Sequence, residues 1–148
     1  MRCSAILVSD APPHASPSLS AADRDRLLAA ARGLLTRAYA PYSGFRVGAA
    51  ILTEAGNIFT GCNVENASYG LTNCAERSAI FSAVAAEGEA MRLRAVAVVN
   101  AQDVACAPCG ACRQVIFEFG PGCIVLFQGK DGIEESTASA LLPAGFTL

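Results

Sequence analysis

The 148-residue sequence has little histidine, lysine or clustered positive charge. It contains a single histidine, His14, a single lysine and no tryptophan, and 11 basic residues against 13 acidic ones give a formal net charge of −2. The arginines are scattered, so the chain lacks the basic cluster with which polynucleotide binders neutralise phosphates. Nucleic acid is therefore not an expected partner, and the sequence favours a small-molecule substrate.

Long apolar runs are also missing. No run reaches the roughly 18 residues that a membrane-spanning helix needs. Residues 1–17 carry one arginine and a short apolar stretch, a pattern too weak for a secretory signal. We expect residues 1–17 to be a flexible N-terminal extension and residues 18–148 to be one domain, which is long enough to bury a core without disulfides.

The seven cysteines are an odd number, so they cannot all pair within one chain. Without a secretory signal they favour a reducing compartment, where thiols bind metal or are simply buried. We therefore expect a cytoplasmic protein that does not associate with membranes.

The hydrophobic pattern predicts an α/β fold. It predicts helices over 19–40, 74–87, 112–119 and 135–142, and strands over 45–52, 58–64, 94–99 and 123–128. The first two strands are expected to form a hairpin, whereas the last two are continuously apolar, as in strands buried on both faces. Helices interleaved with buried strands indicate a three-layer α/β/α sandwich around a mixed, roughly five-stranded sheet.

Two short cysteine motifs carry the most chemical information. Cys74 is followed two residues later by Glu76, and Cys109 and Cys112 lie in the run PCGAC. All three cysteines are expected at helix starts, where exposed N–H groups and the helix dipole stabilise thiolates. Zinc is tetrahedral, so three protein ligands leave one position for water. The pattern therefore favours a catalytic zinc site over a structural one.

A structural zinc site is the main alternative. It needs a fourth ligand, for which the candidates are Cys62, Cys106 and Cys123. These three cysteines lie in or beside apolar runs and are better interpreted as small buried hydrophobic residues. His14 lies in the expected extension, so a catalytic zinc site would be all-cysteine.

Two other uses of the cysteines fit less well. The spacing Cys106-x-x-Cys109-x-x-Cys112 is typical of iron–sulfur proteins, but the bacterial pattern requires a further cysteine where Ile116 stands. A dithiol redox site would give Cys74 and its neighbouring carboxylate no role.

Arg77 is predicted to point inward beside the cysteines. It shares a helix face with Ile80, Phe81 and Val84. Three thiolates on a divalent ion leave excess negative charge, which a nearby guanidinium would compensate. The alternative is an arginine at the helix edge that extends to solvent.

With these motifs the sequence resembles the cytidine deaminase family, in its small, homotetrameric, three-cysteine branch. The similarity covers about residues 21–146 and is dense in FRVGAAILTEAGNIFTGCNVENASYGLTNCAERSA (45–79) and PCGACRQVIFEFGPG (108–122). The zinc deaminase signature H-x-E…P-C-x-x-C allows cysteine in place of the histidine, as at Cys74. Ala107 departs from the serine common before this run.

The resemblance implies one zinc per chain on the three cysteines and Glu76 as the general acid and base. It implies hydrolytic deamination of cytidine and 2′-deoxycytidine to uridine and 2′-deoxyuridine, with zinc-activated water, in pyrimidine salvage. Deamination of another aminopyrimidine nucleoside such as blasticidin S, or of cytidine nucleotides, is the alternative reaction, and a structural zinc module is the non-enzymatic one.

The resemblance also implies the substrate contacts. Asn63 and Glu65 would hold the ribose 3′-hydroxyl, and their spacing of two places them on one face of a strand. Phe45 would pack on the nucleoside, and the backbone of Ala75 would orient the base. Two further aromatic residues would be supplied by neighbouring subunits of a homotetramer, namely Tyr69 and Phe146.

Overall fold

The computed structural model describes residues 18–148. The expected extension over residues 1–17, with His14, lies outside the described residues. Within residues 18–148, no helix combines the length and the apolar composition that crossing a membrane requires.

A five-stranded mixed sheet forms the centre of the domain, in the order β2-β1-β3-β4-β5. Its strands are β1 (Val47–Thr53), β2 (Ile58–Cys62), β3 (Leu93–Asn100), β4 (Ile124–Gly129) and β5 (Gly132–Thr137). The pair β3 and β4 is parallel and the other pairs are antiparallel. The expected hairpin of the first two strands is confirmed, as is complete burial of β4 and near-complete burial of β3.

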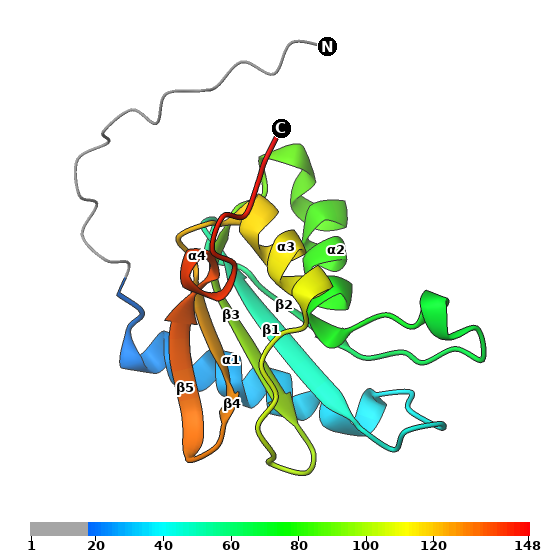
Figure 1. Ribbon diagram of the computed structural model, residues 1–148. Helices are drawn as coiled ribbons and strands as arrows, with labels where there is room; N and C mark the ends of the chain where they lie inside the picture. Colours follow the sequence, from blue (N-terminus) through cyan, green and yellow to red (C-terminus); the bar gives the residue numbers. More distant parts are fainter. Residues whose placement is uncertain (1–17) are drawn as a thin grey trace.

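Helices cover both faces of the sheet, so the expected three-layer sandwich is confirmed (Figure 1). The helices are α1 (Ala21–Gly33), α2 (Ala75–Glu87), α3 (Gly110–Phe119) and α4 (Ala138–Leu141). Helix α1 packs on one face through Leu27, Leu28 and Ala31. Helices α2, α3 and α4 pack on the other face, and α2 and α3 lie side by side there.

Two glycines allow helices to approach the sheet closely. A Cβ atom added at Gly61 in β2 would lie 2.5 Å from the Ala75 carbonyl oxygen at the start of α2. A Cβ atom added at Gly48 in β1 would lie 2.1 Å from the Ala31 carbonyl oxygen of α1. Both distances are far below van der Waals contact, so glycine at position 61 fixes where the first turn of α2 sits.

The C-terminal part of the fold differs from the prediction. The segment expected to be helical over 135–142 begins as β5, and only Ala138–Leu141 is helical. β5 is a mostly polar edge strand, so it has no apolar run that the sequence pattern could reveal. It forms because the short turn after Gly129 returns the chain antiparallel to β4.

Two other elements end earlier in the chain than predicted. Helix α1 ends at Gly33 rather than at the predicted residue 40, and a 3-10 turn at Leu35–Arg37 follows it. Ser20 is its N-cap, since its Oγ accepts a hydrogen bond from the backbone N–H of Asp23 at 3.1 Å. β2 ends at Cys62, so the segment after it follows an extended path outside the regular ladder.

Candidate active site

The N-termini of α2 and α3 bring three thiols together. Cys74 is the N-cap of α2, Cys109 is the N-cap of α3, and Cys112 lies in the first turn of α3. Their sulfur atoms all lie within 4.8 Å of one another. The backbone N–H and the hydroxyl of Ser78 both donate to the Cys74 carbonyl, at 3.1 and 3.2 Å, which fixes the first turn.

This donor set fits a soft cation with tetrahedral geometry. Within residues 18–148, no fourth cysteine, histidine or carboxylate joins the three thiols. Three thiolates are ligands that zinc accepts, and the missing fourth ligand is the mark of a catalytic rather than a structural site. The fold therefore offers no fourth protein ligand for a structural zinc site in the described part of the chain.

The pKa values of the thiols depend on one another and on the charge of Arg77. A hydrogen bond from the Cys112 thiol lowers the pKa of Cys74 to about 5, and the hydrogen bond and charge of Arg77 act in the same direction against burial. The same hydrogen bond and burial raise the pKa of Cys112. The Nη2 atom of Arg77 lies 3.3 Å from the Cys74 sulfur. The predicted inward orientation of Arg77 is therefore confirmed, although its helix-face neighbour Phe81 is half exposed.

Glu76 is a buried carboxylate beside this cluster. Only 4% of its surface is exposed. Burial raises its pKa to about 7, and the negative charge of Cys74 adds to the effect, while hydrogen bonds and Arg77 oppose it. A carboxyl group with this environment can change protonation near neutral pH, as a general acid and base must.

A cavity of about 190 Å³ opens next to Glu76 and two of the thiols. Its wall includes the predicted substrate residues Phe45, Asn63 and Ala75. The other lining residues are Val47, Thr72, Asn73, Cys74, Val98, Cys106, Ala107 and Cys109. Apolar side chains thus surround a few polar groups, which is the usual composition of a small-molecule site.

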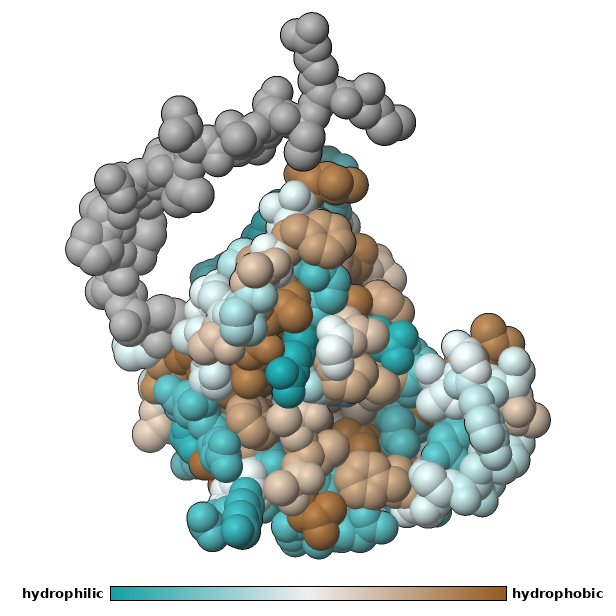
Figure 2. All heavy atoms as spheres, viewed as in Figure 1, coloured by the Kyte–Doolittle hydropathy of each residue, from teal (hydrophilic) through white to brown (hydrophobic). Residues whose placement is uncertain are grey.

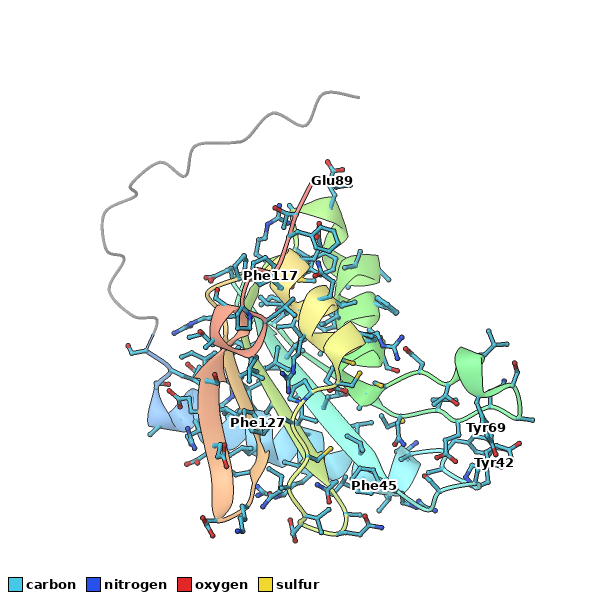
Figure 3. The ribbon with its side chains drawn as sticks, viewed as in Figure 1. Tyr42, Phe45, Tyr69, Glu89, Phe117 and Phe127 are labelled. Atoms are coloured by element: carbon cyan, nitrogen blue, oxygen red, sulfur yellow. The ribbon has the colours of Figure 1, made fainter. Side chains whose placement is uncertain are left out.

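The other predicted substrate residues lie outside this cavity. Glu65 and Tyr69 line a second cavity of about 370 Å³, and Thr72 borders both cavities. The Tyr69 ring contacts that of Tyr42 edge-on, with centroids 6.2 Å apart, away from Phe45 (Figure 3). Phe146 lines neither cavity, and its carbonyl accepts a hydrogen bond from Gln114 at 3.0 Å.

The cysteines outside the cluster differ in burial. Cys123 is buried, as predicted, and burial raises the pKa of its thiol to about 12. Cys62 and Cys106 are only partly buried, so their interpretation as buried hydrophobic residues is wrong. Cys106 is held at the cavity wall because its N–H donates to the Gln128 carbonyl of β4, and this long-range bridge leaves no local sequence signal.

Arg113, which was not predicted as a site residue, braces the metal-binding loop. Arg113 donates from Nε to the Pro108 carbonyl at 2.7 Å and from Nη1 to the Leu141 carbonyl at 3.0 Å. It therefore ties the residue before Cys109 to the end of α4. Its position directly after Cys112 was a possible signal, but its second partner depends on tertiary structure.

Comparison with known proteins places the site in a known family pattern. The model of the cytidine and deoxycytidylate deaminase zinc-binding region matches residues 21–128. Cytidine deaminase of Sporosarcina psychrophila is 47% identical over 128 residues, which cover 84% of this chain and 92% of that protein. The crystal structure of cytidine deaminase from Burkholderia pseudomallei shares 50% identity at a TM-score of 0.75, covering 82% of this chain and 98% of that one.

A relative with a different name is more distant. Blasticidin-S deaminase of Bacillus cereus is 34% identical over 108 residues, which cover 68% of this chain and 76% of that protein. The zinc-binding family model and the three-thiol cluster together identify zinc as the metal of this site.

Proposed function

Because the chain belongs to the cytidine and deoxycytidylate deaminase family, we propose that it deaminates cytidine and 2′-deoxycytidine hydrolytically, releasing uridine or 2′-deoxyuridine and ammonia. One observation carries the proposal. A buried carboxylate, Glu76, shares a cavity with Cys74 and Cys109 of a three-thiol metal cluster. That combination is suited to hydrolysis at a ring carbon and has no use in a structural zinc module.

Cys74, Cys109 and Cys112 would hold the zinc ion. Bound zinc supplies the Lewis acidity that lowers the pKa of a water molecule from about 16 to about 7. Arg77 acts on the ligands, because its guanidinium beside Cys74 offsets the excess negative charge of three thiolates. Without Arg77, the three thiolates would bind protons more readily, and a zinc ion held by them would be a weaker Lewis acid toward water.

Glu76 carries the protons. It takes one proton from the attacking water and delivers it to N3 of the cytosine ring, which makes C4 electrophilic. After the water oxygen has added to C4, Glu76 takes the remaining proton of the new C4 hydroxyl and passes it to the 4-amino group. The C4–N bond then breaks as the C4 carbonyl forms, and the amino group leaves as ammonia. One carboxylate can serve both transfers because the water, N3 and the amino group all lie around C4.

The remaining substrate residues orient the nucleoside. Phe45 lines the cavity and is proposed to pack on the nucleoside. Ala75 at the start of α2 also lines the cavity, and its backbone is proposed to orient the base. Asn63 and Glu65 are proposed to hold the ribose 3′-hydroxyl from the two adjoining cavities. Thr72 borders both cavities, which supports a substrate that spans them with its base in one and its sugar in the other.

The proposal includes a homotetramer with shared active sites. Tyr69 and Phe146 are 78% and 66% exposed, which is unusual for large aromatic side chains. The loop between β2 and α2 projects from the body of the domain (Figure 1), and apolar residues appear at its tip (Figure 2). A neighbouring subunit that covers this loop would bury Tyr69 and close the site against water. Phe146, near the C-terminal end beside Gln114 of α3, would reach the site of another subunit.

We place the reaction in pyrimidine salvage in the cytoplasm. The substrate class is a free nucleoside, and salvage reactions use free nucleosides. The six cysteines in the described part of the chain are free thiols, as is usual in a reducing compartment.

An absorbance assay tests the proposed function. The zinc-loaded protein is offered cytidine, 2′-deoxycytidine, CMP, adenosine and blasticidin S in parallel. Turnover of the first two, well above the others, is the expected result. A preference for blasticidin S would identify the alternative reaction, and turnover of none would favour a structural zinc module.

A further inference from the structure

The turn before β1 is held by a side chain to which the sequence analysis gave no role. In this turn Gly44 has φ of +68° and its N–H donates to the Ala40 carbonyl at 3.0 Å. The Ser43 hydroxyl accepts a hydrogen bond from the N–H of Phe45 at 3.0 Å. The same hydroxyl donates to the Glu65 carboxylate. Ser43 therefore links the proposed aromatic wall to the proposed sugar-binding carboxylate.

The hydrogen bonds of Glu65 leave room for one more donor. An ionised carboxylate offers about four acceptor positions, two on each oxygen. Oε2 accepts the backbone N–H groups of Tyr42 and Ser43, at 2.8 and 3.3 Å, and Oε1 accepts the Ser43 hydroxyl. These bonds hold the pKa of Glu65 below its usual value, the Ser43 hydroxyl contributing most. Among the contacts of residues 18–148, the acceptor position left open is on Oε1, beside the Ser43 hydroxyl.

Asn63 is constrained in the same way from the other side. Its Nδ2 donates to the Phe45 carbonyl at 2.8 Å and its Oδ1 accepts the Val47 N–H at 2.9 Å. One N–H of its amide remains available for a ligand. Both peptide groups of Phe45 are thus tied, its N–H to Ser43 and its carbonyl to Asn63.

From these contacts we infer that Ser43 is a positioning residue that gives this chain its selectivity for a nucleoside with a free 3′-hydroxyl. The inference rests on the proposed function. By occupying one acceptor position of Oε1, Ser43 leaves the carboxylate a single direction in which to accept a hydroxyl. By holding the Phe45 N–H, Ser43 also fixes the aromatic wall relative to that direction.

Removal of the Ser43 hydroxyl should change substrate selectivity, which a general loss of stability would not do. In Ser43→Ala the carboxylate of Glu65 can rotate, which weakens its hydrogen bond to the 3′-hydroxyl. A substrate without the 3′-hydroxyl does not make this bond, so its kcat/KM falls less than that of cytidine. The ratio of kcat/KM for cytidine to that for 3′-deoxycytidine is therefore the relevant measurement. Destabilisation alone would lower both values and leave their ratio unchanged.

The experiment compares four zinc-loaded proteins on these two substrates: the wild type, Ser43→Ala, Ser43→Thr and Ser68→Ala. Ser43→Thr keeps the hydroxyl, and Ser68 is an exposed serine of the neighbouring loop whose backbone N–H, rather than its hydroxyl, makes the bond to Asn66. Ser43→Ala is expected to reduce the ratio about tenfold, mainly through KM for cytidine. Ser43→Thr and Ser68→Ala are expected to keep the wild-type ratio.

A second comparison tests whether Ser43 acts through Glu65. In a Glu65→Gln background, Ser43→Ala should change the ratio little further, because the partner is already altered. Calorimetric binding of uridine and 3′-deoxyuridine gives the same ratio without turnover. Should Ser43→Ala fail to fold, Ser43→Cys takes its place, because the cysteine thiol is only a weak hydrogen-bond donor.

The outcomes separate the inference from the function on which it rests. An unchanged ratio in Ser43→Ala, with the wild type favouring cytidine, would overturn the role of Ser43 alone. A wild type that deaminates neither nucleoside would instead overturn the proposed function, and the role of Ser43 with it.

Discussion

The guanidinium of Arg77 lies 3.3 Å from the sulfur of Cys74, one helical turn away on α2. Its Nε atom is buried and makes no hydrogen bond within residues 18–148, so the side chain is not held there by a general polar network. The contact with the thiolate cluster is what places this charge. This contact supports the proposed role of Arg77 as the positive partner of the three thiols.

Replacement of Arg77 by alanine is expected to lower both zinc affinity and turnover. Loss of a group that supports metal ligands typically costs 10- to 100-fold in metal affinity or activity. Competition with a chromogenic chelator measures the zinc affinity. Arg26→Ala is the control, since Arg26 pairs with Asp23 at the surface, away from the thiols. Equal zinc affinity in Arg77→Ala and wild type would assign Arg77 to packing alone.

Some of the cysteines are expected to bind zinc and others are not. Cys109→Ala should lose zinc and thermal stability, because the free energy of metal binding contributes to folding. Cys106→Ala and Cys123→Ala should keep one zinc per chain by elemental analysis. Cys106 is the sharper control because it lines the same cavity as Cys109. Zinc loss in Cys106→Ala would mean a four-ligand site.

Gly61→Ala should destabilise the fold by about 2 kcal/mol, as overpacking usually does. The added methyl group would lie 2.5 Å from the Ala75 carbonyl oxygen and from the Ala79 nitrogen, which forces α2 away from β2. Chemical denaturation measures the effect. Gly122→Ala has open space around the new Cβ and should change stability much less. Equal effects of the two substitutions would argue against the close approach of α2 as the constraint.

Much of this architecture could be predicted from the sequence because its signals are local. The continuous apolar runs predicted β3 and β4, and α2 ends at the predicted residue 87, before Gly88 with φ of +76°. The cysteine spacing predicted the thiol cluster because helix N-termini fix where Cys74 and Cys109 point.

The remainder depends on contacts between distant segments. β5 is stabilised by pairing with β4 and not by its own pattern. The hydrogen bond from Ser43 to Glu65 joins residues 22 apart, and the hydrogen bond from Arg113 to the Leu141 carbonyl joins residues 28 apart. No periodicity or short motif carries such information.

The assembly prediction concerns the chain terminus. Light scattering should give four times the chain mass of 15.2 kDa at micromolar concentration. Deletion of residues 145–148 should raise KM for cytidine while zinc stays bound, because Phe146 would no longer reach a neighbouring site. Deletion that leaves KM unchanged, or a fully active monomer, would contradict shared sites and leave the deaminase proposal intact.

Turnover of cytidine by Glu76→Gln beside the wild type, each with its zinc content measured, tests the central claim most directly. Glutamine is nearly isosteric but cannot accept the proton of water. Wild type should release uridine and ammonia in equal amounts with one zinc per chain. Glu76→Gln should keep its zinc and lose at least the 10²- to 10⁴-fold typical of general acid–base catalysis. A near wild-type rate in Glu76→Gln, or no ammonia from zinc-loaded wild type, would contradict the account.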